Sequence, residues 1–271
     1  MIKKLIEDET KYFNPILERQ KKTTKEMRSV WQNETVAQRL ERISLETYDL
    51  CNGSVLQGLF KDLKLNRDTW WGKSDLGAQC LGLYEKEILD FISAQQPFHT
   101  FLDIGAADGY YAVGMLHSKM AKNAICFEIS EVGQRTIREN WISNHSPGQI
   151  VIYGAANEQS ISSIASTLPR NSLVLIDIEG FEFSLLTKKV ISLLSKVTII
   201  VEIHNWVDDF LAKYSSLLKN LNKYFKISIL KPSVRNTQNI ELLRSYTDDN
   251  RLLVSSERRP CLMRFLYLEP K

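Results

Sequence analysis

The chain is predicted to be an α/β protein with a Rossmann-like, doubly wound sheet of seven strands. The sheet should be mostly parallel with an antiparallel last strand, and an N-terminal helical extension should precede it. Three observations predict this class. Near-continuous apolar segments alternate with helical patterns from residue 97 onward, as expected for a parallel sheet covered on both faces. A glycine-containing turn follows the first apolar segment, and several later apolar segments end in carboxylates. These features place ligand-binding groups at one edge of the sheet.

Residues 1–96 are predicted to form a helical region, and residues 97–271 the main domain. Apolar-face residues of the first region recur at spacings of four and three: Val36, Leu40, Ile43, Thr47 and Leu50. This spacing indicates one face of a helix. The face either packs on the main domain or forms a seam between two copies, so a homodimer is one expectation. A second helical pattern covers residues 81–93, and Pro97 marks the boundary.

The main domain is predicted to contain seven strands. Their ranges are residues 99–105, 123–129, 148–157, 172–180, 197–205, 226–230 and 262–268. Helical patterns follow the first five strands, over residues 110–120, 131–144, 161–168, 181–195 and 207–225. A long connection joins the last two strands, which we expect to close as an antiparallel hairpin at one edge of the sheet.

The composition excludes several classes of protein. Hydrophobic residues make up 44% of the chain and charged residues 25%, as in ordinary soluble domains. A net charge of +3 is too balanced to require nucleic acid as a partner. No apolar run reaches the roughly 18 residues of a membrane span, and acids interrupt the N-terminus where a signal peptide would be apolar. The four cysteines form no C-x-x-C pair, so we expect neither a zinc site nor disulfides, and a cytoplasmic location.

The most informative segment is FLDIGAADGYYAVGML, which begins at residue 101. Its strand contains Asp103 near the end and continues into a turn in which Gly105 and Gly109 allow close approach of a ligand. A dinucleotide site would need G-x-G-x-x-G to place a pyrophosphate, whereas Asp103 and Asp108 would repel phosphate. A ligand with an amino acid end and a nucleoside end fits better. The segment therefore predicts a site for S-adenosylmethionine.

The second strand supports this prediction. Glu128 lies 19 residues after Gly109, where an acidic residue accepts hydrogen bonds from ribose hydroxyls in nucleotide-binding folds. Tyr110, which opens the helix after the turn, is expected to face the cofactor. Ala106 and Ile129, beside these positions, complete the cofactor contacts expected from the first two strands.

The fourth and fifth strands end in a cluster of ionisable residues. Because alternate residues of a strand point the same way, Asp177 pairs with Glu179, and Glu202 with His204. Such a cluster has three uses. His204 could act as a general base while a carboxylate orients its ring. The acids could instead hold a divalent cation such as magnesium, or bind sugar hydroxyls or the methionine ammonium. We favour the base and predict no metal site, because imidazole among carboxylates is an uncommon magnesium ligand.

Residues 80–271 resemble the FkbM-type S-adenosylmethionine-dependent methyltransferases. The segments that carry the resemblance are LGLYEKEIL, LDIGAADGYYAVGM, CFEIS, YGAAN, LIDIEGFEFSLL and IIVEIHN. The most family-specific part is the D-x-E-G-x-E block at residues 177–182. The resemblance implies the class I methyltransferase fold with a reversed last strand. It also implies O-methylation, typically of hydroxyls on sugars, glycans or natural products.

The resemblance further implies roles for individual residues. The methionine end of the cofactor would lie near Asp103, Gly105 and Gly109, and the ribose near Glu128. The remaining implied contacts are Ala155 and Ala156 at the adenine rim and Asp177 facing the transferred methyl group. The family pattern does not identify a base, so His204, with Asp177 and Glu202 beside it, is an inference from the residues alone.

Five residues are predicted to contact the substrate. Trp70 and Trp71 are adjacent in a polar loop and could stack on a sugar ring or close over the ligand, although such a pair also packs inward in many proteins. Tyr84 and Glu85 lie in the segment matching the family and could approach the ligand's ammonium group. Glu179 completes the set at the end of the fourth strand.

The sequence thus favours an O-methyltransferase acting on a hydroxyl of a small molecule or saccharide. A metal-assisted reaction using the same acids is one alternative. An RNA or protein methyltransferase is another, but no N/D-P-P-Y motif is present and acids stand where a polyanion would bind. A non-catalytic binding module is disfavoured by the intact set of cofactor residues.

Overall fold

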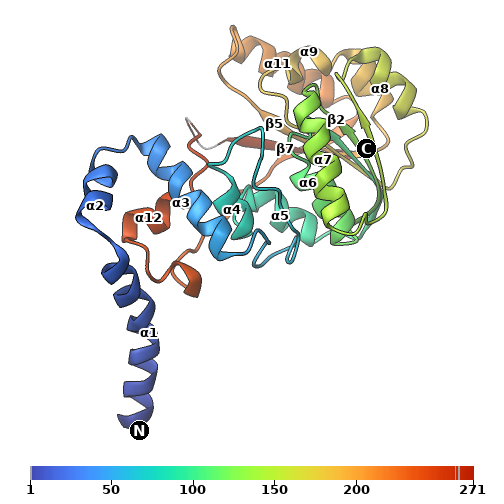
Figure 1. The fold of residues 1–271 in the computed structure, drawn as a ribbon. Coiled ribbons are helices and arrows are strands. Elements are labelled where there is room, and N and C mark those ends of the chain that lie inside the picture. Colours follow the sequence, from blue (N-terminus) through green and yellow to red (C-terminus); the bar gives the residue numbers. More distant parts are fainter. Residues whose placement is uncertain (1, 260, 262) are drawn as a thin grey trace.

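The computed structural model describes residues 2–259, 261 and 263–271 and contains one seven-stranded sheet (Figure 1). The strands are β1 Phe98–Ile104, β2 Ala121–Phe127, β3 Gln149–Tyr153, β4 Ser172–Ile176, β5 Thr198–Ile203, β6 Phe225–Ile229 and β7 Arg264–Pro270. Their order across the sheet is β3-β2-β1-β4-β5-β7-β6. All pairings among β1 to β5 are parallel, and β7 is antiparallel to both β5 and β6. The predicted fold class is confirmed, including the reversed last strand.

Helices flank the sheet and form the N-terminal region. Before the sheet lie α1 Ile2–Lys22, α2 Lys25–Gln32, α3 Val36–Leu50, α4 Leu76–Cys80 and α5 Lys86–Ser93. Between strands lie α6 Tyr110–His117, α7 Glu131–Ser143, α8 Glu158–Ala165, α9 Glu182–Leu185, α10 Lys188–Leu193, α11 Phe210–Leu221, the short 3-10 helix η1 Glu241–Leu243, and α12 Asp248–Leu253.

Side chains alternate along the central strands and feed two apolar layers. In β4, Leu173 and Leu175 belong to the layer that packs under α4 to α7. Val174 and Ile176 belong to the opposite layer, under α8 to α11. The strands are buried on both faces, which explains why they are continuously apolar in sequence.

The register brings three strand ends level with one another. Ile104 of β1 pairs with Phe127 of β2 and with Ile176 of β4. The residues that follow these three strands therefore meet at one edge of the sheet, where doubly wound proteins bind ligands.

Helix α3 of the N-terminal region packs on the connection between β6 and β7. Leu40 and Ile43 of α3 are fully buried against Leu243 and Val254 of that connection, in a small separate core. By contrast, α1 extends away from the rest of the chain (Figure 1), and none of its described residues is buried.

Several predicted bounds differ from the structure; β3 ends at Tyr153 rather than at residue 157, and β4 at Ile176 rather than at residue 180. Two further elements differ in other ways. The helix expected over residues 181–195 is divided into α9 and α10, because Thr187 takes an extended conformation (ψ 162°) and its hydroxyl accepts a hydrogen bond from the Val190 N–H. The last strand begins at Arg264, and Leu262, its predicted first residue, lies outside the described residues. Within the described part of the chain, no helix combines the length and the apolarity that crossing a membrane requires.

Candidate functional site

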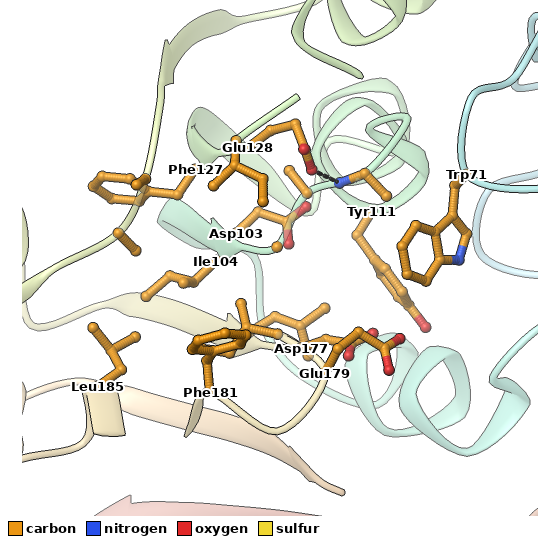
Figure 2. Close-up of a pocket in the computed structure, with 18 of the residues that line it drawn as sticks. Trp71, Asp103, Ile104, Tyr111, Phe127, Glu128, Asp177, Glu179, Phe181 and Leu185 are labelled. Atoms are coloured by element: carbon orange, nitrogen blue, oxygen red, sulfur yellow. Dashed lines mark hydrogen bonds between the residues drawn. The ribbon is translucent and has the colours of Figure 1, made fainter. Parts of the chain in front are cut away.

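A cavity of about 570 Å³ opens at the carboxyl ends of β1, β2, β3 and β4. Its walls are the segments that follow these strands, together with the loop that carries Trp70 and Trp71. Figure 2 shows Trp71 and Tyr111 toward one end of the cavity and Phe127 and Leu185 toward the other. Residues that follow these four strands therefore line one continuous space.

The turn after β1 can take its place only because residue 105 is glycine. Gly105 has a φ of +95°, and a Cβ on it would lie 1.7 Å from the carbonyl oxygen of Asp177. Its N–H and that of Ala106 donate hydrogen bonds to the Phe127 carbonyl, each at 3.0 Å. The turn is thus clamped between β2 and β4, and Gly105 and Ala106 line the cavity as predicted.

Several buried polar atoms on the cavity wall have no hydrogen-bond partner among the described residues. They are Trp70 Nε1, Asp103 Oδ2, Tyr110 Oη and Asp177 Oδ1. Leaving a buried polar group unpaired costs about 1–3 kcal/mol, and such groups in native proteins usually have a partner. Their convergence on one cavity indicates that a polar ligand completes the site.

Asp103 is the most deeply placed acid of the cavity, with 2% of its surface exposed. Burial raises the pKa of Asp103 well above its ordinary value, and the negative charge of Asp177 raises it further. A cationic group brought into the cavity would offset both effects. Asp103 is therefore suited to receive an ammonium group, as predicted for the amino acid end of the ligand.

Glu128 lies on the wall near Asp103, and its carboxylate is held by the backbone. The Ala107 N–H donates to Oε2 at 2.9 Å and the Ser130 N–H donates to Oε1 at 2.7 Å. These bonds orient a carboxylate that still has free lone pairs for ribose hydroxyls. Burial raises the pKa of Glu128, and the backbone hydrogen bonds partly oppose that rise.

The apolar end of the cavity contains predicted and unpredicted residues. Ala155 and Ala156 line it as expected, and Ile129, 76% exposed, stands at its rim. Wall residues that the sequence analysis missed include Phe127, Gly154, Asn157, Phe181 and Leu185. Phe127 and Leu185 line an apolar slot at this end of the cavity (Figure 2).

At the other end, the ionisable residues of β4 and β5 gather as predicted. His204 Nε2 lies 3.4 Å from Asp177 Oδ1 and 3.8 Å from Glu179 Oε2. Burial alone lowers the pKa of His204, but the hydrogen bond that its ring donates to Glu182 and the charge of Asp177 outweigh this effect and raise the pKa. The pKa of Asp177 rises to about 7 through burial and the nearby charge of Glu85.

Glu182 orients the His204 ring, and the sequence analysis did not single it out. Its side chain is fully buried, and His204 Nδ1 lies 3.3 Å from both carboxylate oxygens. The backbone N–H groups of His204 and Gly180 also donate to this carboxylate, each at 2.9 Å. The D-x-E-G-x-E block contained the signal, because its last acid is Glu182.

Two residues predicted to be catalytic do not line the cavity. The side chains of His204 and Glu202 are 2% and 1% exposed, and both lie behind Asp177 and Glu179, which do line it. Glu202 is paired with the guanidinium of Arg259. The structure thus corrects the prediction for Glu202, because a buried ion pair occupies its carboxylate. His204 does not line the cavity, and the cavity-lining acids that face its Nε2 are Asp177 and Glu179.

Glu85 requires a similar correction. This residue, predicted to contact the substrate, is 1% exposed and does not line the cavity. Its carboxylate accepts a hydrogen bond from the Tyr111 hydroxyl at 2.6 Å and pairs with Arg259. Arg259 also contacts Glu257 at 2.8 Å. Arg259 therefore belongs to a buried network of charged residues.

The acidic groups that could hold a metal ion are balanced by cations of the chain itself. Ligand atoms of Asp177, Glu179 and His204 lie within 4.8 Å of one another, as do those of Glu85, Asp177 and Glu202. In the first group the pKa of His204 is raised, and the proton competes with a metal ion for the ring nitrogen. In the second group, Arg259 already contacts Glu85 and Glu202. The donor sets fit a magnesium ion poorly.

The other predicted substrate residues, Trp70, Trp71, Tyr84 and Glu179, all line the cavity. Tyr84 packs edge to face on Tyr110 with ring centroids 5.7 Å apart. Trp71 is 46% exposed, so an incoming molecule can reach its ring. Glu179 lies beside Asp177 in the cavity wall (Figure 2).

The raised pKa values predict that the ligand-free protein loses stability as the pH rises. The pKa of Asp177 is raised to about 7 and that of Glu257 to about 8, in both cases mainly by burial. Between the ordinary value and the raised one, each acid binds more protons in the folded than in the unfolded state. Stability should thus be greatest near pH 5 and fall toward pH 8. Each kcal/mol lost from the free energy of unfolding should lower Tm by about 2–4 °C.

Thermal unfolding across this pH range tests the expectation. Asp177→Asn should reduce the fall in Tm between pH 5 and 7, while the exposed control Asp248→Asn should leave that fall unchanged. A Tm that rises from pH 5 to pH 8 in the parent protein would contradict it.

Comparisons with known proteins found similarity only at the level of solved structures. No protein-family model matches the chain, and no curated protein sequence matches it. One similar structure is a precorrin-6Y C5,15-methyltransferase from Geobacter metallireducens, with 14% identity and a TM-score of 0.43, covering 67% of this chain and 84% of that one. Another is TYW2 of M. jannaschii in complex with AdoMet, with 11% identity and a TM-score of 0.40, covering 70% of this chain and 75% of that one.

A third similar structure, from Streptococcus pneumoniae, is provisionally described as a tRNA (m1A22) methyltransferase and contains S-adenosyl-L-methionine. It is 15% identical, with a TM-score of 0.41, and the match covers 69% of this chain and 73% of that one. At these identities and TM-scores the likeness gives no information on activity. No family model supports the FkbM-type resemblance.

Proposed function

We propose that the chain is an S-adenosylmethionine-dependent O-methyltransferase that modifies a hydroxyl group of a sugar, glycan or natural product. One observation carries the proposal. A single cavity contains unpartnered polar groups and an apolar slot, both of which suit the cofactor. The same cavity is lined by Asp177, whose pKa is raised to about 7. Such a carboxylate can take a proton from a hydroxyl at physiological pH.

The residues present fit S-adenosylmethionine along the length of the cavity. Asp103 would pair with the ammonium group, and Glu128 would accept hydrogen bonds from the ribose. The apolar slot beside Phe127 and Leu185 would hold the adenine. When bound, the cofactor supplies an electrophilic methyl group on a sulfonium centre. Gly105, where a Cβ would collide with the Asp177 carbonyl oxygen, allows the turn that carries these residues to lie directly against the end of β4.

Asp177 is the residue best placed to receive the acceptor's proton. It lines the cavity, and its Oδ1 is buried without a hydrogen-bond partner among the described residues. His204, fixed by Glu182, faces the same oxygen from behind at 3.4 Å. We infer that Asp177 is the general base and that His204 is a positioning residue that stabilises its charge. This revises the expectation that His204 is itself the base.

The walls around Asp177 favour a neutral, hydroxyl-rich acceptor. Glu179 is 47% exposed in its side chain and can accept hydrogen bonds from hydroxyls, while the Trp71 ring offers an apolar face. Carboxylates combined with an accessible aromatic ring suit a saccharide, and they repel phosphates. The O-methylation implied by the FkbM-type resemblance agrees with this chemistry. We expect the enzyme to work in the cytoplasm and without a membrane partner.

A methyl-transfer screen tests the proposal. The full chain is incubated with labelled S-adenosylmethionine and nucleotide sugars, glycan fragments, polyhydroxylated natural products, tRNA or a basic protein. We expect label in a saccharide or natural-product fraction, on a group stable to mild base, as an ether is. Label confined to tRNA or to protein would replace the proposed acceptor class with one of the alternatives.

A further inference from the structure

The loop that carries the two tryptophans, residues 66–72, is fastened to the cofactor end of the cavity. The Asp108 carboxylate accepts hydrogen bonds from the Thr69 hydroxyl and from the backbone N–H groups of Trp70, at 3.2 Å, and Trp71, at 3.3 Å. Asp108 belongs to the same turn as Gly105 and Gly109. Its carboxylate therefore anchors the loop rather than facing a ligand.

A second set of bonds fixes the start of the loop to α7. The Asn140 side chain accepts a hydrogen bond from the Asn66 N–H at 2.7 Å and donates one to the Asp108 carbonyl at 2.8 Å. Asn140 is 4% exposed, so these bonds are shielded from water. The loop is thus held at two points, one on the turn after β1 and one on α7.

The fastened loop places the Trp70 indole against the residues predicted to hold the ribose. A Cβ on Gly133 would lie 2.4 Å from Trp70 Nε1, 2.8 Å from Glu128 Cγ and 3.0 Å from the Ala107 carbonyl oxygen. These three groups therefore surround one point on α7, and any larger residue at position 133 would displace the indole. Trp70 Nε1 is buried and has no hydrogen-bond partner among the described residues, although the ring lines the cavity.

We propose that Trp70 is a cofactor-binding residue whose indole N–H donates a hydrogen bond to a ribose hydroxyl, beside the hydroxyl contacts of Glu128. This inference rests on the proposed function and changes the role expected for Trp70 from substrate stacking to cofactor recognition. A ribose hydroxyl can accept from the indole and donate to the Glu128 carboxylate at the same time. The two residues together then require a sugar with its hydroxyls intact.

Calorimetry with S-adenosylhomocysteine tests the contact without an acceptor. Trp70→Phe keeps an aromatic ring and removes the N–H, and we expect binding to weaken roughly 3- to 10-fold, as the loss of one net hydrogen bond predicts. Trp31→Phe, in α2 and remote from the cavity, is the matched control and should bind like the parent. Trp70→Phe binding as tightly as the parent would overturn the inference.

A pair of nucleosides identifies the group that the indole contacts. The parent should prefer adenosine to 2′,3′-dideoxyadenosine, and Trp70→Phe should lose part of that preference. An unchanged preference in a weakened variant would refute the assignment to the ribose. If the phenylalanine variant fails to fold, benzothienylalanine at position 70 keeps the bicyclic shape, replaces the N–H by sulfur, and should show the same loss. A parent that binds no S-adenosylhomocysteine would refute the proposed function itself, whereas a binding parent with an unaffected variant refutes only the role of Trp70.

Discussion

Asp103→Asn is expected to weaken S-adenosylmethionine binding by roughly 10²–10³-fold, because breaking a buried charge pair costs about 3–5 kcal/mol. The free carboxyl group has a pKa raised well above its ordinary value by burial and by the charge of Asp177. An amide of the same shape keeps the packing but cannot pair with the ammonium group. Calorimetry on the parent and the variant measures the loss directly.

A second readout separates a charge effect from a packing effect. Binding of the ammonium group should draw Asp103 into its ionised form, so the parent should release protons and bind more tightly as the pH rises. Heats measured in buffers of different ionisation enthalpy should reveal this release, and Asp103→Asn should reduce it. Glu128→Gln should weaken binding more mildly, since the amide oxygen still accepts one hydrogen bond. Parent-like affinity in both variants would show that the cofactor does not lie where we place it.

Asp177→Asn is expected to lower the turnover of methyl transfer by roughly 10²–10⁴-fold while cofactor binding stays near the parent value. The reason is that Asp177 lines the cavity and, at 3.4 Å, is the cavity-lining acid nearest to His204 Nε2. The parent rate should rise with pH and level off near the Asp177 pKa of about 7, because only the ionised carboxylate accepts a proton. Initial rates on an acceptor found by the screen measure both effects.

His204 variants distinguish a positioning role from a direct one. His204→Gln removes the imidazolium that faces Asp177, so the apparent pKa of the rate profile should move upward and the rate near neutrality should fall. Full activity of Asp177→Asn with a crippled His204→Gln would reverse the two roles. A metal-assisted reaction makes another claim, namely that a chelator silences the parent and that magnesium or manganese restores it. We expect full parent activity in chelator, because Arg259 and His204 already balance the acids.

The fold and the strand-end residues that line the cavity could be predicted because their signals are local. Apolar strands alternate with helices, and Asp103, Gly105 and Glu128 stand where strands end. The roles of the other charged residues depend on packing between distant segments, which composition and periodicity do not encode. Arg259 lies 174 residues from Glu85 in the chain, and Asp108 lies 39 residues from Thr69. For that reason the sequence indicated ligand contacts for residues, such as Glu85, whose side chains contact other side chains inside the protein.

The most direct test is a calorimetric titration of the full chain with S-adenosylmethionine and, separately, with NAD. The unpartnered groups of the cavity and the acids near its turn predict saturable binding of one S-adenosylmethionine per chain and no binding of NAD, whose pyrophosphate those acids repel. No detectable binding of S-adenosylmethionine at millimolar concentration, or a preference for NAD, would contradict the assignment of this cavity.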